Sequence, residues 1–185
     1  MKKLLFVPWF AMTSQDYKIS LRNFEVQWIK EYSELTKDMV KDADIVLAHS
    51  LWCLEICEFI KKNRLYSQSM DKVILYNPII ESNLANLLKK TTEYRIKNIT
   101  DQRITDNNII SWKNWLMSPL YTVSSFKKII NTYIDYKIDL YKKYKNIYLS
   151  QIDFFSHEYR DRLKCKDIYG DHNEIIYNPM KYYIT

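Results

Sequence analysis

A serine, an aspartate and a histidine each stand close behind a predicted strand in this sequence. Ser50 follows the strand at 45–48, Asp153 follows the strand at 147–152, and His172 follows the strand at 166–169. A serine hydroxyl is a poor nucleophile at neutral pH and needs a neighbouring base to take its proton. A histidine can supply that base, while a carboxylate holds the imidazole in the required tautomer. The three residue types therefore indicate acyl transfer through a covalent serine intermediate.

Each of the three residues also has an ordinary structural explanation. A serine after a strand commonly caps the following helix, Asp153 could cap a short helix behind it, and His172 stands among polar turn residues. The order serine, aspartate, histidine along the chain is nevertheless the order of an α/β-hydrolase triad. Taken together, the three strand ends favour the catalytic interpretation. Four other carboxylates are less well placed than Asp153: Glu158, Asp161, Asp167 and Asp171.

The turn at Ser50 has the pattern of a nucleophile elbow, in which a buried strand, a serine and a helix follow one another. The usual motif G-x-S-x-G is here Ala48-His49-Ser50-Leu51-Trp52, with neither glycine present. Ala48 is a mild change, and His49 is expected to pack or to make a local hydrogen bond. Trp52 either turns its ring into the mouth of the site or distorts the turn. A catalytically inactive hydrolase fold that serves as a binding protein is therefore the alternative function.

The remaining parts of the predicted site are an oxyanion hole and a substrate pocket. Two backbone N–H donors are needed, and we expect them from Leu51 and from Trp9 or Phe10 in the loop after the first strand. The pocket for a small-molecule or acyl substrate is expected from three tryptophans: Trp52, Trp112 and Trp115. Aromatic side chains in this part of the chain could equally pack helices onto the sheet. The chemistry requires no metal and no cofactor.

The elements that position these residues alternate between strand-length and helix-length patterns. Strands are predicted at 4–7, 19–24, 45–48, 73–76, 147–152 and 166–169. Helices are predicted at 25–40, 51–62 and 157–163, the first from apolar residues at helical spacing. This alternation predicts one α/β-hydrolase-like domain over residues 1–185, with a mainly parallel sheet flanked by helices. In such sheets the chemistry lies outside the carboxyl ends of the strands.

Residues 82–144 depart from the alternation, because they contain no clear strand pattern. They stand between the strand predicted at 73–76 and the strand at 147–152, which carries the acid. We expect a helical insert in this region that forms a lid over the site.

The composition excludes some functions and disfavours others. A single glycine excludes the Gly-rich phosphate loops of P-loop and dinucleotide-binding proteins. The net charge of +6 makes nucleic acid a possible partner, but the lysines are scattered as pairs, so a solvated surface is the preferred interpretation. No apolar run reaches the roughly 20 residues of a membrane span. The N-terminus imitates a short signal peptide, yet Pro8 interrupts it, and a first strand is the better interpretation. The sequence does not indicate an oligomeric state.

The three cysteines are Cys53, Cys57 and Cys165. An odd number without framework spacing favours a reducing compartment and predicts a cytoplasmic protein. Cys53 and Cys57 are spaced i, i+4 on the predicted helix after Ser50, so they could be two metal ligands. No histidine clusters with them, and we expect both to be small buried apolar residues.

Two N-terminal segments resemble a known family. The segment EVQWI at 25–29, interpreted as helical, and the strand-to-serine segment DIVLAHSL at 44–51 resemble the small serine hydrolases of the RBBP9/YdeN type. In that family a tryptophan-containing segment opens the helix before a strand that ends in HSLG. The resemblance is weaker over the C-terminal third and absent over 82–144. It implies a compact α/β-hydrolase fold, hydrolysis of an ester-like bond, and catalytic roles for Ser50, Asp153 and His172. Together with the residues above, it predicts a serine hydrolase that acts on an ester- or thioester-like bond.

Overall fold

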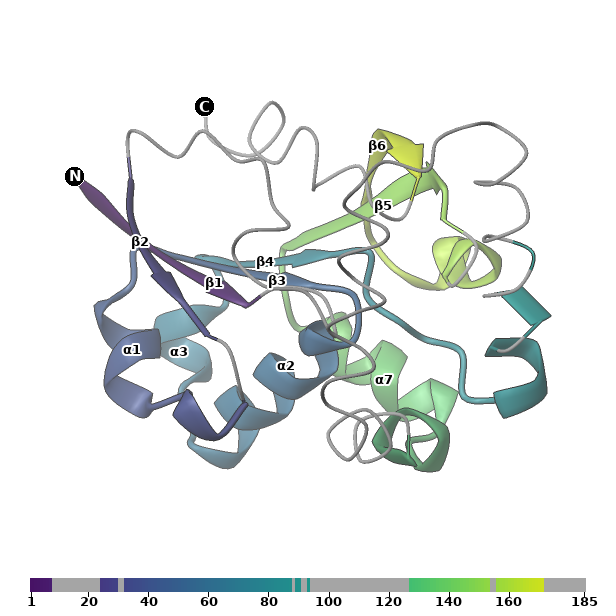
Figure 1. Ribbon diagram of the computed structural model, residues 1–185, viewed down its shortest axis with the longest axis horizontal. Coiled ribbons are helices and arrows are strands. Elements are labelled where there is room, and N and C mark those ends of the chain that lie inside the picture. The colour runs from purple at the N-terminus through teal and green to yellow at the C-terminus, as the bar shows by residue number, and fades with distance from the viewer. Residues whose placement is uncertain are drawn as a thin grey trace.

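Within the part of the chain that the structure describes, six parallel strands form one sheet in the order β2-β1-β3-β4-β5-β6 (Figure 1). The structure is a computed structural model, and it describes residues 1–7, 24–29, 32–87, 89–90, 93, 127–153 and 156–171. The strands are β1 (Lys2–Val7), β2 (Phe24–Trp28), β3 (Ile45–His49), β4 (Val73–Tyr76), β5 (Asn146–Ile152) and β6 (Lys166–Asp171). The predicted α/β class with a parallel sheet is confirmed.

The labelled helices cover one face of this sheet, which is the lower face in Figure 1. They are α1 (Lys37–Asp42), α2 (Trp52–Lys62), α3 (Tyr66–Ser69) and α7 (Ile134–Tyr141). Two 3-10 turns, η2 (Tyr32–Glu34) and η3 (His157–Arg162), add to these helices. The helix predicted at 51–62 is therefore confirmed as α2, and the short polar helix predicted at 157–163 is the 3-10 turn η3.

The central strands are apolar runs because both of their faces are buried. Successive side chains of a strand point to opposite faces, so Leu5 and Val7 of β1 join the core on the helix side, while Leu4 and Phe6 join a second cluster on the other side. All four residues of β4 are buried. Runs of this kind made the strands at 4–7, 45–48 and 73–76 predictable. Each of them is found, as are the strands predicted at 147–152 and 166–169.

The helix predicted at 25–40 is wrong. Phe24, Val26 and Trp28 pack on the second cluster, while Glu25 and Gln27 between them are exposed. This two-residue alternation is that of a strand, and β2 pairs in parallel with β1 from Lys2 to Phe6. Among the described residues of the predicted span, only 37–40 are α-helical, as the first part of α1. Of the strand predicted at 19–24, residues 19–23 lie outside the described residues.

Helix α1 begins with a side-chain cap. The Thr36 Oγ1 accepts a hydrogen bond from the Met39 N–H at 3.2 Å, which satisfies one of the backbone donors that a helix start leaves without a partner. We expect Thr36→Ala to lower the free energy of unfolding by about 1 kcal/mol, measured by urea denaturation. Thr36→Ser keeps the acceptor and should lose much less. Equal losses in the two variants would show that the hydroxyl does not cap the helix.

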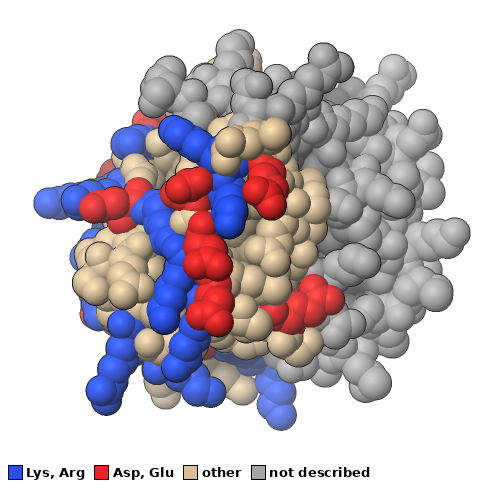
Figure 2. Space-filling view, turned by 90° about the vertical axis from the view of Figure 1, so that its left-hand side faces the viewer, with Lys and Arg blue, Asp and Glu red and all other residues tan. Residues whose placement is uncertain are grey.

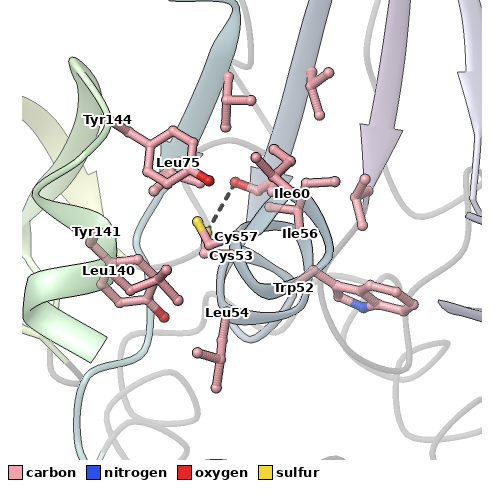
Figure 3. Packing of buried hydrophobic residues seen from close by; sticks show 14 of the residues in the cluster. Trp52, Cys53, Leu54, Ile56, Cys57, Ile60, Leu75, Leu140, Tyr141 and Tyr144 are labelled. Carbon is pink, nitrogen blue, oxygen red and sulfur yellow. Dashed lines mark hydrogen bonds between the residues drawn. The ribbon is translucent and has the colours of Figure 1, made fainter. Parts of the chain in front are cut away.

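Helix α2 is anchored between the sheet and α7. Figure 3 shows Ile56 and Ile60 of α2 on the side of the sheet, with Tyr141 and Tyr144 next to the helix on the side of α7. All four side chains belong to the core cluster. The burial of α2 on two sides fixes the direction of the helix, and with it the position of the turn at Ser50.

The described parts of residues 82–144 are helical. The helical residues are 84–87, 89–90, 93 and 127–131 together with α7, and no strand occurs in these parts, in agreement with the prediction. The Ser82 hydroxyl donates to the Thr132 carbonyl at 2.5 Å. Two points that are 50 positions apart in sequence therefore lie side by side.

On the face drawn in Figure 2, acidic side chains lie among the basic ones. This mixture differs from the single-sign patch that a nucleic-acid interface presents. Among the described residues, no helix has the length and apolar character needed to cross a membrane.

Candidate active site

Ser50 occupies the sharp turn between β3 and α2. Its φ is +61°, in the left-handed region that is costly for a residue with a side chain. The Ser50 N–H donates to the Tyr76 carbonyl of β4 at 2.9 Å, and the Ser50 carbonyl accepts from the Cys53 N–H at 3.2 Å. The adjacent strand and the first helical turn thus hold the serine in its strained conformation. A strained strand–serine–helix turn is the backbone geometry of a nucleophile elbow.

The N-terminus of α2 lies immediately behind Ser50. The helix starts at Trp52 and has 11 residues, and the first N–H groups of a helix carry a partial positive charge that favours a nearby anion. Leu51, the expected first oxyanion donor, has helical φ and ψ of −58° and −38°. Its N–H therefore belongs to the helix start, directly after the serine. Trp9 and Phe10, the expected second donors, lie outside the described residues.

Cys53 lies beneath the elbow and ties α2 to the sheet. Its thiol donates to the Ala48 carbonyl at 3.2 Å, the hydrogen bond dashed in Figure 3. The thiol also lies 3.5 Å from the Tyr76 carbonyl. Burial raises the pKa of the Cys53 thiol well above its usual range, and the charge of Asp153 contributes to the rise. The thiol is therefore a neutral donor. Cys57 is also buried, and the described residues contain no His, Cys, Asp or Glu group arranged for a metal ion.

Trp52 lies in the core. Its side chain is 3% exposed, and its ring centroid is 6.3 Å from that of Tyr32. Figure 3 shows the indole on the flank of α2 opposite to Tyr141. The helix starts regularly here, because the Leu54 N–H donates to the Leu51 carbonyl at 3.0 Å. The turn thus tolerates a tryptophan by burying it, and we do not include Trp52 in the pocket proposed below.

Ser50 stands at the topological switch point of the sheet. The strand β2 lies on one side of β1, while β3 and the remaining strands follow on the other side. Loops leaving neighbouring strands at such a point run in opposite directions, and the crevice between them is where open α/β sheets bind ligands. Ser50 follows β3, which is one of the two strands that border this point.

Asp153 follows β5, two strands away from Ser50. It is 1% exposed, its N–H donates to the Ser150 carbonyl at 3.1 Å, and its carbonyl accepts from the His157 N–H at 3.1 Å. Neighbouring strands lie about 4.8 Å apart, so β3 and β5 are roughly 10 Å apart.

The end of β6 pairs with the end of β5. Asp171 ends β6 and is the Cα partner of Ile152, the last residue of β5. In the sequence, His172 follows Asp171, and Asp153 follows Ile152. His172 itself lies outside the described residues, as do Trp112 and Trp115 of the expected pocket, so their roles stay predictions.

The two described histidines lie in other surroundings. The ring of His49 is buried and meets the Tyr76 ring edge-on, with centroids 5.4 Å apart, while His157 is exposed on η3. Among the alternative acids, Glu158 and Asp161 are exposed on η3, and Asp167 forms an ion pair with Arg160. Burial thus distinguishes Asp153 from these three carboxylates.

Asn77, directly after β4, also belongs to this region, although the sequence analysis did not single it out. Its backbone has a φ of +45°, and its side-chain amide makes two hydrogen bonds to Ser150. The one available signal was an asparagine directly before a proline at a strand end, where asparagine tolerates the left-handed region better than most residues.

Comparisons with known proteins identify structures with a similar fold. No family model matches the chain, and no curated protein matches it. BpoC from Mycobacterium tuberculosis H37Rv, named as a non-heme bromoperoxidase, has a similar structure, with a TM-score of 0.51 and 10% identity over 97% of this chain and 88% of BpoC. A hydrolase from Oleispira antarctica superposes with a TM-score of 0.47 and 14% identity over 96% of this chain and 86% of its own. The architecture is that of the α/β-hydrolases, while the narrower RBBP9/YdeN resemblance rests on sequence motifs alone.

Proposed function

We propose that this protein is a serine hydrolase that cleaves an ester- or thioester-like bond through an acyl-serine at Ser50. The observation that carries the proposal is the backbone of Ser50, strained at a φ of +61° between β3 and α2. Left-handed conformations of non-glycine residues persist where the surrounding structure enforces them, and they cluster at active sites. The position of Ser50 at the switch point of the sheet supports the same conclusion.

The proposed reaction assigns one role to each residue. The Ser50 Oγ attacks the carbonyl carbon of the substrate as His172 takes the hydroxyl proton, and Asp153 stabilises the imidazolium. The oxyanion of the tetrahedral intermediate accepts a hydrogen bond from the Leu51 N–H and one from Trp9 or Phe10. His172 then gives its proton to the leaving group. Water hydrolyses the acyl-serine by the same steps and regenerates the enzyme.

The substrate of this reaction is proposed to be a small molecule with an apolar acyl group. Trp112 and Trp115 would line its pocket, and the helical insert over 82–144 would cover the site. Lids of this kind exclude water from the reacting groups.

A fluorophosphonate probe tests the proposal directly, because it phosphonylates activated serines. We expect the folded wild-type protein to be labelled, with the adduct found by mass spectrometry on the peptide that contains Ser50. Protein that has been heat-denatured serves as the control and should remain unlabelled. A folded wild-type protein that resists the probe would support the alternative, an inactive hydrolase fold that binds a ligand.

A further inference from the structure

The side chain of Asn77 holds the end of β4 against β5. Its Oδ1 accepts from the Ser150 N–H at 2.7 Å, and its Nδ2 donates to the Ser150 Oγ at 2.8 Å. The Asn77 N–H also donates to the Tyr148 carbonyl at 2.9 Å. Asn77 and Ser150 are both fully buried, so water does not compete for these bonds. Hydrogen bonds in such surroundings are costly to break, because the remaining partner stays unsatisfied.

Tyr76, the residue before Asn77, binds the chain on the β3 side of β4. The Tyr76 carbonyl accepts from the Ser50 N–H at 2.9 Å, and the Tyr76 hydroxyl lies 3.3 Å from the Ser150 Oγ. Since β4 lies between β3 and β5, the two adjacent residues Tyr76 and Asn77 connect the nucleophile strand to the acid strand.

Ser150 in turn binds the turn that carries Asp153. Its carbonyl accepts from the Asp153 N–H at 3.1 Å and from the Arg160 Nη2 at 2.8 Å. The Ser156 hydroxyl, three residues after Asp153, donates to the Pro78 carbonyl. Both sides of the turn that carries Asp153 are thereby tied to the Asn77-Pro78 segment.

We propose that Asn77 is a positioning residue that sets the separation between Ser50 and Asp153. The inference rests on the proposed function, and it deepens that function by naming the group that aligns the triad. Asn77 acts through Ser150 and does not touch the substrate. A displacement of about 1 Å at a catalytic group can cost on the order of 10²-fold in rate, which makes such a residue detectable by kinetics.

The left-handed backbone of Asn77 allows a clean test variant. Glycine adopts a φ of +45° without penalty, so Asn77→Gly removes the amide and keeps the turn. We expect its maximal rate constant of fluorophosphonate labelling to fall by about 10- to 100-fold. The probe concentration that gives half of the maximal rate should change less than about twofold, because binding of the probe does not involve Asn77.

A matched control separates alignment from stability. Ser69, at the end of α3, is buried. Its hydroxyl donates to the carbonyl of Leu65, the residue before α3, at 2.8 Å. Ser69→Ala should lower the melting temperature while the labelling rate stays at the wild-type value. Ser150→Ala removes only one of the two bonds to Asn77, and it should show a smaller fall in rate than Asn77→Gly.

The outcomes distinguish this inference from the proposed function. A labelled wild-type protein together with a folded Asn77→Gly variant that reacts at the same rate would overturn the inference and leave the hydrolase proposal intact. If Asn77→Gly does not fold, an unchanged labelling rate in Ser150→Ala overturns the inference instead. An unlabelled, folded wild-type protein overturns both.

Discussion

Ser50→Ala should abolish covalent labelling by fluorophosphonate and leave the protein folded. The alanine lacks the oxygen that attacks the probe, and loss of the nucleophile in a serine triad typically costs about 10⁶-fold in rate. The Ser50 N–H and carbonyl make the hydrogen bonds that shape the turn, and the substitution keeps both. Labelling followed by gel fluorescence, with circular dichroism as the test of folding, measures the two expectations together. A labelled Ser50→Ala protein would place the reactive residue elsewhere.

Ser50→Gly is the matched variant for the strained backbone. Glycine removes the cost of a φ of +61°, which is roughly 1–2 kcal/mol for a residue with a side chain. Its greater entropy in the unfolded chain offsets about 0.5–1 kcal/mol of this gain. We therefore expect Ser50→Gly to be unreactive and more stable than Ser50→Ala by up to about 1 kcal/mol. A less stable glycine variant would contradict the strain at this position.

The second large effect is expected at Lys137, which is fully buried on α7. Its Nζ lies 2.9–3.1 Å from four oxygens: the carbonyls of Ile80, Glu81 and Ile129 and the Ser82 hydroxyl. These acceptors come from the segment after β4 and from the helical residues at 127–131. One side chain thus connects the start of the insert to its C-terminal part.

Lys137→Met should lower the free energy of unfolding by about 2–4 kcal/mol at pH 8. Methionine has a similar volume, but it leaves the buried carbonyls of Ile80 and Glu81 without the lysine donor, at about 1–3 kcal/mol each before relaxation. The Ile129 carbonyl keeps the hydrogen bond from the Thr132 N–H. Removal of the buried amine offsets part of that loss. Urea denaturation measures the difference, and Lys142→Met, at an exposed lysine on the end of α7, should leave the stability within about 0.5 kcal/mol.

The stabilisation by Lys137 should also depend on pH. Burial lowers the pKa of Lys137 to about 7, although the charge of Glu81 opposes the shift. Above that pH the folded protein releases the proton, whereas the unfolded chain retains it until the ordinary lysine pKa. The free energy of unfolding therefore rises with pH in this window, by up to about 1.4 kcal/mol per pH unit.

The pH dependence is measured as the difference in stability between wild type and Lys137→Met. This difference should grow from pH 7 to 9 and stay constant below pH 7, where both states hold the proton. A difference that is independent of pH from 6 to 9 would contradict the lowered pKa.

Local patterns were sufficient for most of the sheet, because burial on both faces of a central strand appears in sequence as a continuous apolar run. The run of Val73–Tyr76 was identified in this way. The edge strand β2 was not, since its alternation is only five residues long and adjoins apolar residues that also fit a helical period. Pairing with β1 decides in favour of the strand, and that pairing is not a local property.

The same distinction between local patterns and non-local contacts applies to the candidate site. The strand–serine–helix turn at Ser50 and the order of the serine, the aspartate and the histidine were predictable, because both are properties of the linear chain. Three further features appear only in the folded chain: Trp52 is buried against Tyr32, Asn77 binds Ser150, and Lys137 joins two distant segments. Each of these contacts joins residues that are 8 to 73 positions apart, and the energy of a hydrogen bond or a packed ring depends on distance in space, which a one-dimensional pattern does not contain.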